Sequence, residues 1–271
     1  MIKQYKISVP KSTLNEIYKK VRNFPWSAAQ NMNGWEYGTN LNYLKSISEY
    51  WITKYDWKKF ENKINSLKNY RTKVEDINLH FIFEKSKNPN SRPLLLLHGW
   101  PGSITEFLDI IPRLAHPEKY GGKIEDGFDV IVPSLPGFGF SSQIKKALGP
   151  RKIGKILNKF MVKNLGYKNY FVQGGDWGAT IAGWIGLDSS KNCKGIHINC
   201  LPLRHPKGPK NSKEKKWEKK FNFDQIMQEG YRTQQATKPQ TLSYAMIDSP
   251  VGIAAWILEK FHGWSDLKMG K

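Results

Sequence analysis

The sequence has few cysteines and no long hydrophobic run, and its acidic residues are far fewer than its basic ones. Its two cysteines, Cys193 and Cys200, are too few for a disulfide framework. No window reaches the roughly 18 apolar residues that a membrane-spanning helix needs. The N-terminus, Met1 to Lys6, has charges where a secretory signal peptide needs its apolar segment. We therefore expect a soluble, cytoplasmic protein.

Positive charge is in large excess. The 271 residues include 43 Lys+Arg and 23 Asp+Glu, for a formal net charge of +20. The lysines are scattered, often in pairs, and only the stretch 207–220 is locally dense. Neither zinc-finger spacing nor an RNA-binding aromatic signature accompanies them, so we expect general lysine enrichment and no nucleic-acid partner. Peripheral contact with an anionic membrane stays open as an alternative.

The pattern of apolar residues predicts three regions. With 39% hydrophobic and 13% aromatic residues, the chain can bury a large core. Residues 1–70 are expected to be helical, without a strand, and Thr13 and Glu16 are expected to form a capping box for a helix over 11–23. Residues 201–271 contain three early prolines and then helical patterns, which indicates an all-helical insertion.

Between these regions, residues 71–200 alternate strand and helix patterns. A hairpin is expected over 72–83, and continuous apolar runs at 93–97, 128–132 and 170–172 are typical of strands buried on both faces. A helix over 104–111, another over 153–161 and a buried strand over 195–200 complete the pattern. This order predicts an α/β fold with a parallel sheet and ligand chemistry at the carboxyl ends of its strands.

An acid flanked by glycines follows the strand at 170–172. In Gly174-Gly175-Asp176-Trp177-Gly178 the spacing is typical of a nucleophile elbow, a strand-to-helix turn that needs small residues beside its central one. An ordinary surface turn has the same composition and is the alternative. A serine needs a base to become a nucleophile, whereas a carboxylate is already ionised at neutral pH. Asp176 could therefore attack an epoxide or alkyl halide carbon directly.

Two further turns follow buried strands. In His98-Gly99-Trp100-Pro101-Gly102 the glycines would let backbone N–H groups face a developing oxyanion. Trp177, directly after the elbow acid, would supply another N–H group. We predict that Trp100 and Trp177 contribute mainly these amides, with their indole rings lining an apolar pocket. The second turn, 135–141, is rich in glycine.

Taken in this order, the three motifs resemble those of the microsomal-type epoxide hydrolases, an α/β-hydrolase-fold family that includes the juvenile hormone epoxide hydrolases. The resemblance runs from about Tyr5 to the end of the chain, and segments 230–241 and 248–266 are similar to motifs of the family's helical cap. It implies that Asp176 opens epoxides to vicinal diols through an alkyl-enzyme ester. It also implies that Tyr231 is one of two cap tyrosines that hold the epoxide oxygen, a role that suits a protonated phenol.

The sequence departs from the family after the cap. There a second tyrosine, an acid and a histidine follow, and the histidine activates the water that hydrolyses the ester. Residues 267–271 contain none of these, and none of the six histidines lies in a Gly-Gly-His loop; we expect His262 to be structural. We therefore expect the N-terminal two-thirds of an epoxide hydrolase, without the late strands of the sheet and with turnover uncertain.

Two other functions remain open from the sequence. A haloalkane dehalogenase also uses an aspartate nucleophile on this fold, although the motifs at Gly230-Tyr231 and Thr237-Lys238-Pro239 favour the epoxide. A non-catalytic protein that retains an apolar ligand pocket is the alternative from a different class. The expected ligand is a small apolar epoxide, xenobiotic or lipid, and we expect neither a cofactor nor a metal.

Overall fold

The computed structural model describes residues 1–32, 34–200 and 207–267, which fold as two compact units. Within the described ranges, the first unit comprises residues 1–8 and 57–200, and the second comprises 9–56 and 207–267. The expected N-terminal segment 1–70 is therefore shared: its two ends pack with the sheet, and its middle packs with the helices near the C-terminus.

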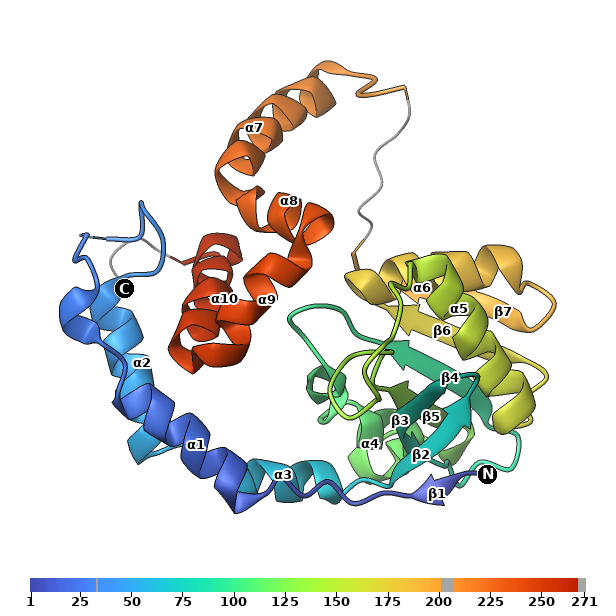
Figure 1. The fold of residues 1–271 in the computed structure, drawn as a ribbon. Coiled ribbons are helices and arrows are strands. Elements are labelled where there is room, and N and C mark those ends of the chain that lie inside the picture. The colour runs from blue at the N-terminus through green and yellow to red at the C-terminus, as the bar shows by residue number, and fades with distance from the viewer. Residues whose placement is uncertain (33, 201–206, 268–271) are drawn as a thin grey trace. The chain divides into compact units, whose positions relative to one another are not determined.

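The first unit contains a seven-stranded sheet in the order β1-β2-β3-β5-β4-β6-β7 (Figure 1). Neighbouring strands from β1 to β5 are antiparallel, and β5, β4, β6 and β7 run parallel. The hairpin and the three expected buried strands are confirmed. The strands are β1 (Lys3–Gln4), β2 (Asn69–Val74), β3 (Ile77–Glu84), β4 (Arg92–Leu97), β5 (Phe128–Pro133), β6 (Tyr170–Gly174) and β7 (Cys193–Ile198).

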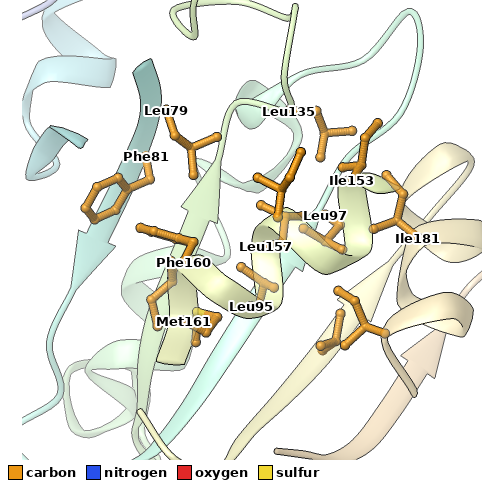
Figure 2. Packing of buried hydrophobic residues seen from close by; sticks show 14 of the residues in the cluster. Leu79, Phe81, Leu95, Leu97, Leu135, Ile153, Leu157, Phe160, Met161 and Ile181 are labelled. Atoms are coloured by element: carbon orange, nitrogen blue, oxygen red, sulfur yellow. The ribbon is translucent and has the colours of Figure 1, made fainter. Parts of the chain in front are cut away.

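Helices cover both faces of this sheet because alternate strand residues point to opposite sides. Leu95, Leu97 and Ile131 pack with α5 and α6 on one face, as Figure 2 shows in part, whereas Leu96 and Val130 pack on the other. The helical segments of this unit are α3 (Trp57–Asn65), η2 (Ile104–Phe107), α4 (Ile111–Ala115), η3 (Pro117–Tyr120), η4 (Ile124–Asp126), α5 (Pro150–Lys159), the π-helical turn η5 (Phe160–Asn164) and α6 (Trp177–Asp188).

The described residues of the second unit form helices joined by loops, and they contain no strand. Val21, Leu44 and Val251 form its small core, so helices from both ends of the sequence pack together. Polar contacts also join the two ends of the sequence within this unit: Lys20 Nζ lies 2.8 Å from Asp248 Oδ1, and the Thr39 hydroxyl donates to the Ala255 carbonyl oxygen at 2.6 Å. Its elements are α1 (Lys11–Arg22), η1 (Trp26–Ala28), α2 (Leu41–Thr53), α7 (Ser212–Gln228), α8 (Gly230–Thr237), α9 (Pro239–Asp248) and α10 (Pro250–Trp264).

The structure corrects three expectations near the N-terminus and in the first crossover. The strand β1 exists and pairs with β2, so residues 1–70 are not purely helical. The helix α1 begins at Lys11 and has no side-chain cap, which places Thr13 inside the helix and removes the expected capping box. The helix expected over 104–111 is broken into η2 and α4. Pro112 explains the break, because it has no N–H group to continue a helix and favours a first turn.

The last strand also differs from expectation. The strand β7 ends at Ile198, and Cys200 lies beyond it and is exposed. Ile196 is 45% exposed, so this strand is not buried on both faces. The reason is its position: β7 lies at the end of the described sheet and pairs with β6 on one side.

Candidate active site

Asp176 lies at the apex of a tight turn between β6 and α6. Its backbone has φ 50° and ψ −124°, a conformation that side chains rarely adopt, and its side chain is exposed. A Cβ atom on Gly174 would lie 2.1 Å from the Gly178 carbonyl oxygen, and one on Gly178 would lie 2.1 Å from that of Leu97. The glycines are therefore required by close backbone approach, as expected of a nucleophile elbow.

The turn after β4 lies directly against this acid. The Trp100 amide donates a hydrogen bond of 2.9 Å to Asp176 Oδ1. A Cβ atom on Gly99 would lie 2.0 Å from the same oxygen. The Gly175 amide donates to the Leu97 carbonyl oxygen at 3.2 Å, which ties the two turns together. The carboxylate is thus oriented by one backbone amide, which binds Oδ1.

The His98 side chain is buried behind this turn and connects it to the glycine-rich turn after β5. Its Nδ1 atom lies 3.1 Å from the Gly99 carbonyl oxygen, and its Nε2 atom accepts a hydrogen bond of 3.1 Å from the Leu135 amide. Because a carbonyl oxygen can only accept, Nδ1 carries the proton. Burial lowers the pKa of His98, although the Gly99 carbonyl and the Asp176 charge act in the opposite direction. His98 therefore holds the turn as a neutral imidazole.

Pro101 and Trp177 complete the set of residues expected around the oxyanion. Pro101 is exposed and follows a cis peptide bond from Trp100. The Trp177 amide belongs to the first turn of α6, where N–H groups have no acceptor within the helix. The Asp176 side chain makes no capping bond to that turn. Trp177 as a whole is 50% exposed.

Glu106 is a second carboxylate at this site, which the sequence analysis missed. A Cβ atom on Gly102 would lie 1.5 Å from Glu106 Oε1, so the carboxyl group lies over the turn that contains Trp100. The side chain as a whole is exposed, yet partial burial of its carboxyl group raises the pKa of Glu106; the Ser103 amide opposes this shift, and the Asp176 charge adds to it. The capping-box pattern Ser103-x-x-Glu106 was the available signal.

Tyr231 is described within the second unit, near the start of α8. Its ring meets the Trp264 ring edge to face, with centroids 5.3 Å apart. The Lys260 ammonium lies 5.4 Å from the centroid of the Tyr231 ring. These contacts join α8 to α10.

Comparisons with known proteins identify the family and the fold of this chain. Residues 2–107 match the family model described as the epoxide hydrolase N terminus, and residues 92–246 match that of the alpha/beta hydrolase fold. The structure of juvenile hormone epoxide hydrolase from the silkworm Bombyx mori is similar to this chain, with a TM-score of 0.87 and 30% identity over 98% of this chain and 67% of that one. The chain belongs to the epoxide hydrolase family.

Other relatives support this membership. The structure of the Aspergillus niger epoxide hydrolase matches with a TM-score of 0.83 and 28% identity, over 96% of this chain and 69% of that one. Epoxide hydrolase 1 of Oryctolagus cuniculus is 35% identical over 98% of this chain and 63% of its own length. A provisionally named epoxide hydrolase of Stigmatella aurantiaca is 40% identical, over 98% and 61% respectively. The chain thus spans about three fifths of the length of these curated relatives.

Two further histidines of this epoxide hydrolase family member, His80 and His262, are held by hydrogen bonds or by ring stacking. The ring of His80 is buried between Ser134 Oγ and Asn69 Oδ1, at 2.9 and 3.0 Å. The ring of His262 stacks on that of Trp35, with centroids 3.9 Å apart and planes within 1°. This stacking agrees with the structural role expected for His262. His205 lies outside the described residues.

Neither a metal cluster nor a membrane span is found in the described parts of the chain. Within 1–32, 34–200 and 207–267, no three His, Cys, Asp or Glu side chains are grouped closely enough to hold a metal ion. In the same ranges no helix has the length and apolar character needed to cross a bilayer.

Proposed function

We propose that this chain carries out the ring-opening half of epoxide hydrolysis, with Asp176 as the nucleophile. Oδ2 of Asp176 attacks a ring carbon, the ring C–O bond breaks, and the ring oxygen takes the bonding electron pair. The product is an alkyl ester of Asp176 with a neighbouring hydroxyl group. The observation that supports this most directly is the exposed carboxylate at the apex of the elbow, with Oδ1 bonded to the Trp100 amide.

The ring oxygen needs a proton as its bond to carbon breaks. We propose that Tyr231 donates it, because a phenol is protonated at neutral pH and can form a hydrogen bond before it transfers its proton. The family membership supports this proposal. The choice of Tyr231 rests on the resemblance of segment 230–241 to a motif of the family's helical cap. The Trp100 and Trp177 amides are proposed to hold the oxyanion that forms when water attacks the ester.

Ester hydrolysis requires a general base, and we propose that His80, His98 and His262 do not supply one. His80 and His98 are buried with both ring nitrogens engaged, and His262 is stacked on Trp35. In these 271 residues, ring opening would then proceed without ester hydrolysis, and the ester would persist.

The substrate is proposed to be a small apolar epoxide. The relatives named juvenile hormone epoxide hydrolases suggest an aliphatic lipid epoxide, and styrene oxide represents the xenobiotic class. Both probes should be compared with a bromoalkane. Release of bromide without consumption of epoxide would favour a haloalkane dehalogenase.

Intact-protein mass spectrometry after incubation with excess styrene oxide tests the proposal. We expect one added substrate mass, located by digestion to the peptide that contains Asp176, and no diol beyond one equivalent. Asp176→Asn should abolish the adduct. The matched control Asp109→Asn, which removes an exposed carboxylate paired with Lys63, should retain it. Steady production of diol would show that a base is present, and absence of any adduct would contradict the assignment of Asp176.

A further inference from the structure

Lys260, near the C-terminal end of α10, is a buried lysine, with only 9% of its surface exposed. Lysine side chains are seldom buried unless their charge is paired. Neither the fold of the sheet nor the proposed chemistry of Asp176 explains why a cation lies at this position. The groups that surround Lys260 explain why this cation can be buried.

Three acceptors hold the Lys260 ammonium. Nζ donates to the Gln228 carbonyl oxygen at 3.2 Å and to Gln228 Oε1 at 3.1 Å, and lies 2.6 Å from Glu259 Oε2. An ammonium has three N–H donors, so these contacts account for all of them. Lys260 is therefore a fixed point charge and not a mobile side chain.

This fixed charge lies close to two aromatic rings. Nζ is 5.4 Å from the centroid of the Tyr231 ring and 6.0 Å from that of Trp264. Both distances lie within the range in which a cation is attracted to the face of a ring. The two rings also meet edge to face at 5.3 Å with an interplanar angle of 62°. The Tyr231 ring is thus restrained by a cation and by an indole.

The same pair of helices has a second polar contact one turn away. Trp256 Nε1 donates to Gln235 Oε1 at 3.0 Å. Gln235 lies four residues after Tyr231 on α8, and Trp256 lies four residues before Lys260 on α10. Residues four apart share one helix face, so one face of α8 is held against one face of α10 at two successive turns.

The geometry points to Lys260 as a positioning residue for Tyr231. We propose that its ammonium, fixed by Gln228 and Glu259, restricts the orientation of the phenol ring and thereby favours the proton transfer proposed for the Tyr231 hydroxyl group. This inference rests on the proposed function of Tyr231. A purely structural role is the competing explanation, since Gln228 ends α7 and a cation at a helix C-terminus binds its last carbonyl groups.

A double-mutant cycle separates the two roles. Lys260→Met keeps the length of the side chain and removes its charge, and Tyr231→Phe removes the hydroxyl group. We expect Lys260→Met to slow formation of the Asp176 adduct by about tenfold, the size typical of coupled neighbours, and to have no further effect in Tyr231→Phe. Lys260→Arg should restore most of the rate. An equal slowing by Lys260→Met in both backgrounds would overturn the proposal.

Two other variants control for stability. Lys20→Met removes a lysine of the same unit that pairs with Asp248, and it should leave the rate unchanged. If Lys260→Met does not fold, Glu259→Gln replaces it, because this change loosens the ammonium but keeps the cation. We expect a smaller slowing in the same direction, again absent in Tyr231→Phe, and a rate equal to that of the unsubstituted protein would contradict the proposal.

A second readout does not depend on chemistry at Asp176. Fluorine NMR of protein labelled with 3-fluorotyrosine gives one resonance for each of the 12 tyrosines, and the one lost in Tyr231→Phe is that of residue 231. Lys260→Met should shift or broaden this resonance, and Lys260→Arg should not. If no adduct forms in any variant, the proposed function fails. An unmoved Tyr231 resonance in Lys260→Met would instead refute the positioning role.

Discussion

At the residue scale, Asp176 is held in a strained backbone conformation by neighbours that have no side chains. Its φ of 50° lies in a region that costs non-glycine residues about 1–3 kcal/mol. The Trp100 amide compensates in part by bonding Oδ1. Because a methyl group on Gly99 would overlap that carboxylate, the space beside it is already full.

Gly99→Ala should therefore reduce ring opening sharply. The new methyl group would lie 2.0 Å from Asp176 Oδ1 and 2.5 Å from its Cβ, and neither the elbow nor the turn can move without breaking the Trp100 hydrogen bond. We expect at least about a hundredfold slower formation of the Asp176 adduct, since removal of one oriented donor has effects of this size. We also expect destabilisation of about 1–3 kcal/mol from overpacking. Mass spectrometry and urea unfolding measure the two effects.

Gly183→Ala is the matched control for this change. Gly183 lies in the middle of α6, is exposed, and has no atom within 4 Å of the added methyl position. Alanine favours a helix over glycine by about 1 kcal/mol, so the variant should be slightly more stable and equally reactive. A loss of reactivity here like that in Gly99→Ala would mean that crowding of the carboxylate is not the cause.

The raised pKa of Glu106 predicts how one contribution to folding stability depends on pH. Its pKa is raised, so the folded protein binds its proton more tightly than the unfolded chain does. The stabilisation that this provides is present at low pH and is lost as the pH rises above the ordinary value near 4.5. Glu106→Gln removes the charge but can still bond the Ser103 amide. It should raise the free energy of unfolding at pH 7 and not at pH 4, by less than about 1 kcal/mol because water screens an exposed group; the melting temperatures at the two pH values show the difference.

Glu106→Ala provides the comparison, because it removes the cap as well as the charge. It should be less stable than Glu106→Gln at both pH values. If the two variants melted alike at pH 4, the contact with Ser103 would contribute nothing, and the carboxyl group would act through its charge alone.

Sequence patterns predicted some residues of the candidate site and missed others. Asp176, Gly99 and Trp100 could be predicted because a tight turn restricts which residues fit, and this restriction is visible in the order of the residues. Glu106 and Lys260 could not be predicted as neighbours of the candidate site residues. Their importance depends on what surrounds them after folding, and a single acid or lysine in a helical pattern is ordinarily a solvated surface residue.

At the scale of elements, His80 joins two strands to the turn after β5. Its Nε2 atom faces Asn69 Oδ1 in β2, and its Nδ1 atom faces Ser134 Oγ. The Asn69 amide nitrogen donates to two backbone carbonyls, those of Ile64 and Leu67, which fixes Oδ1 as the acceptor. Nε2 therefore carries the proton, and the Ser134 hydroxyl donates to Nδ1.

This network predicts loss of stability in acid. Burial lowers the pKa of His80 from 6.5 to about 3, and the positive charge of Arg71 contributes. The unfolded chain then binds a proton that the folded protein does not, so stability falls as the pH drops from about 6.5 towards 3. In His80→Gln this part of the pH dependence should disappear, although stability at pH 7 should fall by about 1–3 kcal/mol because a buried hydrogen bond is lost. Urea unfolding between pH 7 and pH 4 measures both.

His116 is the control for this prediction. It is half-buried near Glu84 and Glu118, and the nearest carboxylate oxygens lie 3.9 and 4.0 Å from its ring. We expect His116→Gln to leave the fall between pH 6.5 and pH 4 in place. A curve for His80→Gln that is parallel to that of the unsubstituted protein would show that His80 is not the group that titrates.

At the scale of the whole molecule, the central strands of the sheet were predictable, whereas the edge strand β1 and the division of the chain into two units were not. Buried strands appear as continuous apolar runs, so their number and direction follow from local patterns. The assignment of residues 9–56 to a unit with α7–α10 depends on contacts such as Thr39 with Ala255. These partners are more than two hundred residues apart, and no local pattern specifies them.

The exposed edge of the sheet favours association between chains in solution, whereas the net charge opposes it. In the described residues, the outer edge of β7 has no strand partner, and Ile196 in β7 and Leu187 in α6 are 45% and 69% exposed. An unpaired apolar edge favours association with another chain. The charge of +20 opposes association through repulsion, which salt screens, with a Debye length of about 10 Å at 0.1 M and about 3 Å at 1 M.

The 271-residue chain should therefore associate more strongly at high salt. Sedimentation velocity at 0.05 M and 1 M NaCl should show a larger weight-average mass at 1 M, and Ile196→Lys should abolish the difference because it places a charge on the strand edge. Ile226→Lys is the matched control: Ile226 is 79% exposed on α7, a helix of the second unit, and its replacement should leave association intact. Equal suppression by both variants would mean that added charge, and not the edge of β7, controls association.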